Sequence, residues 1–110
     1  MSKRGINLYI DDILFSIKKI ERYIKGVSFD DFCKDERTID AVIRNIEIIG
    51  EAAKNIPKEI QDKNPDIPWK IILSMRNKVA HEYFGVDVDI LWKTAKEDII
   101  DLKKKIKKLK

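Results

Sequence analysis

The sequence predicts an all-α bundle of four main helices plus short helices, built as a single domain over residues 1–110. Apolar residues recur every three or four positions over long stretches, which is the period of an amphipathic helix. No stretch shows the strict alternation that is typical of a half-buried strand. A chain of 110 residues is also long enough to bury one core without disulfides or metals.

The net charge indicates only a mild attraction for polyanions. The chain has 23 basic and 19 acidic residues, a formal net charge of +4, and this balance alone does not identify a nucleic-acid binder. The basic excess gathers at the end, at Lys103, Lys104, Lys105, Lys107, Lys108 and Lys110. These lysines are either a solvated helix face that favours the negative end of the helix dipole or a patch that steers RNA.

The cysteine count and the hydropathy pattern indicate a cytoplasmic protein without a membrane segment. Cys33 is the single cysteine, so it cannot form an intramolecular disulfide, and we expect it as a half-buried hydrophobe in a reducing compartment. No apolar run approaches the ~18 residues of a membrane helix. Asp11 and Asp12 interrupt the apolar sequence that a signal peptide requires after its basic start.

A long first helix and a short second one are predicted from residue 6 to about residue 32. The stripe of the first helix is Ile6, Ile10, Ile13, Ile17, Ile20 and Ile24. Gly26 fits the C-terminal cap of this helix. Ser28, with Asp31 three residues later, can begin a short helix through Phe29 and Phe32.

A third helix follows, and we expect it to contribute one residue to a functional site. Its stripe is Ile39, Val42, Ile43, Ile46, Ile49, Ala53 and Ile56. Asp35 or Thr38 can cap its start, and Pro57 ends it. Gly50 lies inside this helix, where glycine costs about 1 kcal/mol relative to alanine, so we expect a close backbone contact there. Glu51 beside it is therefore a candidate wall of the site.

The polar segment between Pro57 and Pro68 has room for at most one helical turn. Pro68 suits a first helical position, and the next helix is predicted to run to Tyr83 or Phe84, where Gly85 stops it. Its apolar residues are Trp69, Ile72, Leu73, Met75, Val79 and Ala80.

Asp87 or Asp89 is expected to cap the last helix. Its stripe is Leu91, Trp92, Ala95, Ile99, Leu102, Ile106 and Leu109. Asp87-Val88-Asp89 imitates the paired carboxylates of a nucleotidyltransferase, but it lacks a preceding Gly-Ser and a sheet to hold it. Helix capping is therefore the better interpretation than metal binding.

Four side chains that suit phosphate chemistry fall within eight positions of the fourth main helix. Arg76 can bind a phosphate, Asn77 supplies an amide, His81 titrates near neutral pH and Tyr83 supplies a phenol. His81 is the only histidine of the chain. The structural alternatives are a histidine that bonds a carbonyl at a helix end, an arginine in an ion pair with Glu51 or Glu82, and a packed tyrosine.

Helix geometry indicates that this cluster is half of a site. Asn77 and His81 are one turn apart on one side, whereas Arg76 and His81 are about 140° apart on an ideal helix. Phosphodiester cleavage without a metal needs one group that takes a proton and another that gives one, and each chain has one histidine. If this face lies at a twofold axis, two chains form a composite site with two imidazoles and two guanidiniums.

The segment Arg76–Tyr83, read Arg-Asn-Lys-Val-Ala-His-Glu-Tyr, fits the R-x4-H-x-Y form of the HEPN ribonuclease motif. The chain resembles the HepT toxin family in particular. The similar segments include residues 9–14, 48–53, 67–69 and 83–87, so the resemblance covers most of the chain.

The resemblance implies a HEPN-type bundle and a homodimeric, metal-independent endoribonuclease that needs no cofactor. Its active cleft would lie at the dimer interface, and its RNA products would end in a 2′,3′-cyclic phosphate. Arg76 and His81 are implied to be catalytic, with Asn77 supporting them; Glu51 is expected as a further supporting residue at the wall of the site.

The resemblance also implies regulation by a partner protein. HepT-like proteins are paired with a minimal nucleotidyltransferase antitoxin that transfers AMP from ATP to the motif tyrosine, here Tyr83, and silences the toxin. An adenylate on Tyr83 would put negative charge where the RNA phosphate has to bind. The alternative is a non-catalytic HEPN module that binds a nucleotide or its nucleotidyltransferase partner.

Overall fold

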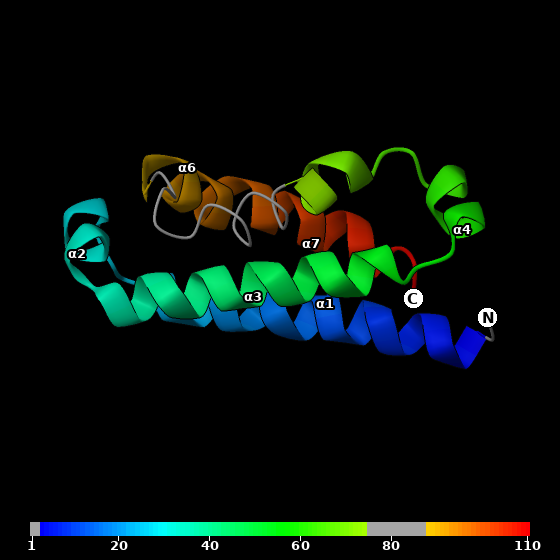
Figure 1. Cartoon of the computed structure of the whole chain (residues 1–110), viewed down its shortest axis with the longest axis horizontal. Coiled ribbons are helices and arrows are strands. Elements are labelled where there is room, and N and C mark those ends of the chain that lie inside the picture. Colours follow the sequence, from blue (N-terminus) through cyan, green and yellow to red (C-terminus); the bar gives the residue numbers. More distant parts are fainter. Residues whose placement is uncertain (1–2, 75–87) are drawn as a thin grey trace.

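The computed structural model describes residues 3–74 and 88–110, and these residues form helices and short connections without any strand (Figure 1). The all-α prediction is therefore confirmed for the described part of the chain. The elements are α1 (Lys3–Ile24), α2 (Phe29–Lys34), α3 (Glu36–Lys54), α4 (Lys58–Lys63), α6 (Val88–Lys93), the π-helical turn η2 (Thr94–Asp98) and α7 (Ile99–Lys107). Residues 69–74 are helical as well.

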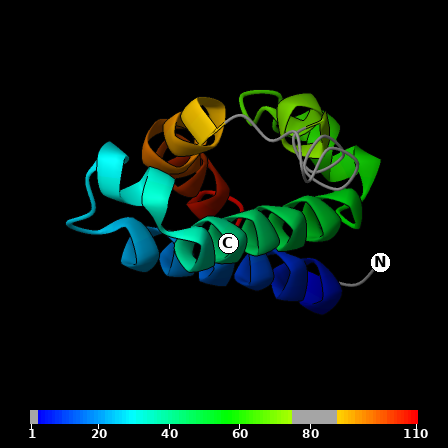
Figure 2. The same cartoon turned by 60° about the vertical axis from the view of Figure 1, so that its left-hand side comes forward.

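Two long helices form the base of the molecule. α1 and α3 run antiparallel side by side, and α2 connects them at one end (Figures 1 and 2). α6, η2 and α7 follow one another as a continuous helical rod, which packs against α1 through η2 and α7 and against α2 through α6. α4 lies at the opposite end from α2, where the chain turns back after α3 (Figure 1).

The predicted stripe of α1 faces the core along its whole length. Ile10, Ile13, Ile17 and Ile20 are completely buried, and Ile24 is nearly so. The helix ends as predicted, because Gly26 adopts φ +74°, a left-handed conformation that glycine reaches without steric cost.

The starts of α2 and α3 are capped by side chains. The Ser28 hydroxyl accepts a 3.1 Å hydrogen bond from the backbone N–H of Asp31. Asp35, rather than Thr38, caps α3: its carboxylate accepts from the Thr38 backbone N–H at 3.1 Å and from the Thr38 hydroxyl at 2.6 Å. The hydroxyl bond and then the backbone bond lower the pKa of Asp35 below its ordinary value of 3.8.

The segment after Pro57 holds more helix than the sequence predicted. α4 spans six residues, whereas at most one turn was expected. Ile60 packs against the core, which gives this polar segment an apolar anchor. The Gln61 side-chain amide also donates to the carbonyls of Ile56 at 2.9 Å and Ala53 at 3.3 Å, so it satisfies groups at the end of α3.

The helical segment 69–74 is fixed at its beginning. Helix starts at Trp69, one residue later than predicted, and the Pro68 carbonyl accepts the first helical bond from Ile72 at 3.0 Å. Trp69 is buried, and its indole N–H donates to the carbonyl of Asn64 at 3.0 Å. The predicted end near Tyr83 or Phe84 lies outside the described residues.

The last helix keeps its predicted stripe but contains a turn that the sequence did not predict. Residues 94–98 form a π-helical turn between α6 and α7. Leu91 before this turn, Ala95 within it, and Ile99, Leu102 and Ile106 after it are all buried. Asp89 lies in the first turn of α6, inside the helix, so it is not the cap; Asp87 lies outside the described residues.

The prediction for Cys33 was wrong. Its thiol is exposed, because Phe32, the residue before it on α2, is the one that points into the core. The ring of Phe32 packs against Trp92 with centroids 4.8 Å apart. Among the described residues, no helix is long and apolar enough to cross a membrane.

Candidate functional site

The four predicted site residues of the motif, Arg76, Asn77, His81 and Tyr83, lie outside the described residues. Their arrangement, including the composite site of two chains, stays a prediction. The structure describes the helical segment that leads into the motif and the surface around Glu51, the fifth predicted site residue.

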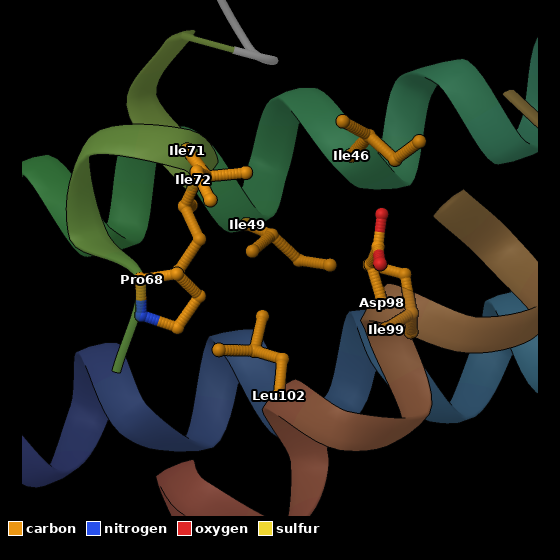
Figure 3. A pocket seen from close by; sticks show the side chains of 8 residues that line it. All are labelled: Ile46, Ile49, Pro68, Ile71, Ile72, Asp98, Ile99 and Leu102. Atoms are coloured by element: carbon orange, nitrogen blue, oxygen red, sulfur yellow. The ribbon is translucent and has the colours of Figure 1, made fainter. Parts of the chain in front are cut away.

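The segment 69–74 rests on the core through an apolar contact surface. Its residues, together with α3, η2 and α7, line a small cavity of about 30 Å³ (Figure 3). The labelled side chains are Ile46, Ile49, Pro68, Ile71, Ile72, Asp98, Ile99 and Leu102, and all are apolar except Asp98. This surface can orient the helical segment 69–74, and Asp98 is the one ionisable side chain in its lining.

Glu51 lies in a polar groove between α1 and α3. The groove has a volume of about 350 Å³, and its polar lining comes from both helices. Tyr9 and Asp12 come from α1, and Arg44, Glu47, Glu51 and Asn55 come from the α3 side. Glu51 is exposed, and its place at the wall of a catalytic site stays a prediction. The side-chain amide of Asn55 donates to the Glu51 carbonyl at 2.9 Å and closes the last turn of α3.

The structure separates two acidic neighbours of α1. Asp12 faces the groove that contains Glu51. Asp11 instead pairs with Lys110, its Oδ1 atom lying 2.6 Å from the ammonium nitrogen. Adjacent residues of a helix point about 100° apart, so Asp11 and Asp12 lie on different faces of α1. Of this pair, only Asp12 shares a surface with Glu51.

Sequence reasoning missed Arg44 and Glu47 as neighbours of Glu51. Residues 44, 47, 51 and 55 are spaced by three and four positions, which places them on one face of α3. This polar stripe lies on the side of α3 away from the apolar stripe, and its spacing was the signal in the sequence that could have identified these residues. With three carboxylates and one guanidinium, the groove suits a cationic or hydrogen-bonding partner better than a bare phosphate.

Comparison with known proteins gives the family. Residues 13–109 match the family described as "Ribonuclease HepT-like". The chain is 50% identical over 108 residues to "Probable ribonuclease HepT" of Thermococcus cleftensis, covering 98% of each chain. It is 45% identical over 101 residues to a "Putative RNase" of Caldanaerobacter subterraneus subsp. tengcongensis, covering 92% of this chain and 90% of the relative.

A third relative has a longer chain. "Gamma-glutamylcyclotransferase and putative RNase" of Methanocaldococcus jannaschii is 45% identical over 107 residues, which are 97% of this chain but 48% of the relative. No solved structure matches the chain. The family match spans most of the sequence and agrees with the all-α architecture, so the chain belongs to the HepT-like family.

Proposed function

We propose that this protein is a metal-independent endoribonuclease, the toxin of a HEPN/nucleotidyltransferase toxin–antitoxin module, and that its single HEPN domain spans residues 1–110. The observation that carries the proposal is the 50% identity, over 98% of both chains, to a relative named as a ribonuclease. The Arg-x4-His-x-Tyr motif at residues 76–83 supplies groups that suit RNA cleavage.

The proposed reaction uses the 2′-hydroxyl of RNA as the nucleophile. His81 takes the proton of that hydroxyl as its oxygen attacks the adjacent phosphorus. Arg76 binds the phosphate and stabilises the charge that develops on it. The bond to the 5′-oxygen breaks, and that oxygen receives a proton from an imidazolium. The products are a 2′,3′-cyclic phosphate and a free 5′-hydroxyl.

The need for a base and an acid supports a homodimer. One chain contributes a single histidine, so two chains at a twofold axis supply both groups. Asn77 would hold the motif in place, and Glu51 would line the wall of the cleft. We place the protein in the cytoplasm, where both its RNA substrate and its partner occur.

The proposed switch is Tyr83. A minimal nucleotidyltransferase antitoxin would join the Tyr83 oxygen to the α-phosphorus of ATP, with loss of the phenolic proton and release of pyrophosphate. The attached adenylate would fill the cleft and repel the RNA phosphate. Tyr83→Phe should remain an active ribonuclease that the antitoxin can no longer modify.

The test compares the purified wild type with His81→Ala and Tyr83→Phe on single-stranded RNA in the presence of EDTA. The wild type and Tyr83→Phe should yield cyclic-phosphate ends, and His81→Ala should lose at least about 100-fold in rate. No cleavage by any of them, together with retained binding of the nucleotidyltransferase, would contradict the ribonuclease and support the non-catalytic module. Intact mass after coexpression with the nucleotidyltransferase should show AMP on the wild type and on His81→Ala, which both keep Tyr83, but not on Tyr83→Phe.

A further inference from the structure

A long groove runs between α1 and the rod formed by η2 and α7. It consists of two hollows, of about 380 and 450 Å³. The first is lined by Lys103 of α7 and the second by Glu21 of α1, and these two side chains form an ion pair with 3.0 Å between Nζ and Oε1. This ion pair crosses from α7 to α1 between the two hollows. From Asp11 to Ile24, the groove follows α1 for about 20 Å.

Positive charge is concentrated in this groove. Lys18 and Arg22 come from one face of α1, four residues apart, and Lys25 comes from the turn that follows this helix. The cations from the other side are Lys96, Lys103, Lys107 and Lys110. Only two carboxylates, those of Asp11 and Glu21, line the groove with them. The groove thus carries a formal charge of +5, and the rest of the chain a charge of −1, since the whole chain has +4.

The two carboxylates neutralise only part of this charge. Asp11 pairs with Lys110, and Glu21 pairs with Lys103. Within the described part of the chain, Lys18 and Lys107 form no ion pair, although both line the first hollow. Dipole stabilisation explains lysines in the last turn of α7. It does not explain why α1 presents cations to the same groove, where like charges repel one another unless an anion lies between them.

An exposed aromatic ring lies among these lysines. Phe15 lines the first hollow and is 62% exposed, on the side of α1 opposite the buried Ile13 and Ile17. The ammonium of Lys19 lies 4.8 Å from the centre of its ring. Basic grooves with exposed aromatic rings bind single-stranded nucleic acid, because lysines contact phosphates and bases of any sequence stack on the ring.

We propose that the groove between α1 and α7 binds single-stranded RNA. Lys18 and Lys107 contact phosphates, and Phe15 stacks on a base. The proposal rests on the proposed function, because it assigns a second binding surface for the RNA substrate outside the motif at residues 76–83. It also favours one of the two interpretations of the lysine-rich C-terminus, the one in which these cations steer RNA.

The test uses 2′-O-methyl RNA, which lacks the nucleophilic hydroxyl, so that binding is measured without cleavage. Lys18→Glu/Lys107→Glu should bind a fluorescent single strand at least tenfold more weakly, with the slope of log K against log salt shallower by about 1.4, since each lost phosphate contact removes about 0.7. Phe15→Ala should weaken binding by about tenfold. The matched controls are Lys34→Glu/Lys58→Glu, which makes the same charge change on α2 and α4, and Leu8→Ala, another exposed apolar residue of α1.

Cleavage assays separate this inference from the proposed function. The groove variants should lose kcat/KM on long RNA but keep wild-type cleavage of a dinucleotide, which is too short to occupy groove and active site together. A wild type that cleaves neither substrate would contradict the ribonuclease, whereas the binding assay would still test the groove. Groove variants that bind RNA as their controls do, or that change only sedimentation or capture of the nucleotidyltransferase, would overturn the inference in favour of a protein-binding surface.

Discussion

The indole N–H of Trp69 donates a 3.0 Å hydrogen bond to the carbonyl oxygen of Asn64. The Asn64 side chain in turn donates to the Ile60 carbonyl at 2.8 Å, in the last turn of α4. These bonds join α4, the following loop and the start of the helical segment 69–74. That segment leads directly to residues 76–83, so the pair determines where the chain enters the proposed catalytic motif.

Replacing Trp69 by phenylalanine should therefore lower both stability and activity. The substitution keeps an aromatic ring but leaves the Asn64 carbonyl without its donor, which should reduce the free energy of unfolding by about 1–3 kcal/mol in urea denaturation. Trp92→Phe is the control, because the Trp92 indole has no hydrogen-bond partner within the described ranges. Equal losses in the two variants would show that ring volume, and not the hydrogen bond, sets the effect.

Truncating a buried aliphatic side chain of α1 should lower the free energy of unfolding far more than truncating an exposed one of similar size. The side chain of Ile17 is completely buried in the core, whereas that of Leu8 is 58% exposed. Ile17→Ala should lower the free energy of unfolding by about 2–5 kcal/mol, through lost burial and the cavity that remains. Leu8→Ala should change it by no more than about 0.5 kcal/mol. A large loss for Leu8→Ala in the dilute monomer would contradict this packing.

The cap at Asp35 should give stability a dependence on acid pH. The hydrogen bonds of the native state lower the pKa of Asp35. The cap therefore stabilises the native state fully at pH values above the ordinary pKa of 3.8, and this stabilisation is lost as the pH falls through the lowered native pKa. Asp35→Ala should melt a few degrees below the wild type at neutral pH. The difference between the two melting temperatures should shrink at acid pH, whereas a difference that grows there would contradict the cap.

Glu51 and Glu47 offer a comparison within one groove. They are one helical turn apart on α3 and line the same polar surface. If Glu51 supports the catalytic residues, Glu51→Gln should lower kcat on RNA by about tenfold, less than the loss of a proton-transfer group, and Glu47→Gln should leave kcat unchanged. Circular dichroism should show the same helix content in both variants. Equal effects of the two substitutions on kcat would show that kcat depends on the total charge of the groove and not on Glu51 in particular.

The local features of the fold were predictable because nearby residues determine them. The stripe of α1, the positive φ of Gly26 and the capping of α2 by Ser28 depend on periodicity and backbone chemistry within a few positions. The length of α4 was underestimated because Ile60 and Gln61 are stabilised by contacts with the core and with the end of α3. Such contacts give no signal in the polar sequence of the segment itself.

Relationships between distant segments were not predictable from periodicity. Lys103 and Glu21 are 82 positions apart, and only the antiparallel packing of α1 with α7 brings them together. For the candidate site, the sequence predicted Glu51 as a wall residue but did not predict that Arg44 and Glu47 line the same groove. Cys33 was misjudged because its local pattern did not reveal which of two adjacent apolar residues turns inward.

The π-helical turn between α6 and α7 marks a position at which we expect the last rod to tolerate a change in length. A π-helical turn corresponds to one residue inserted into an α-helix. Leu91 is buried before the turn, Ala95 is buried within it, and Ile99 and Leu102 are buried after it. The exposed residues of the turn are 96–98. Deletion of one exposed residue there would restore an uninterrupted α-helix and keep both apolar stripes in phase. We therefore expect natural length variation among homologues to gather at this turn, while α1 admits none.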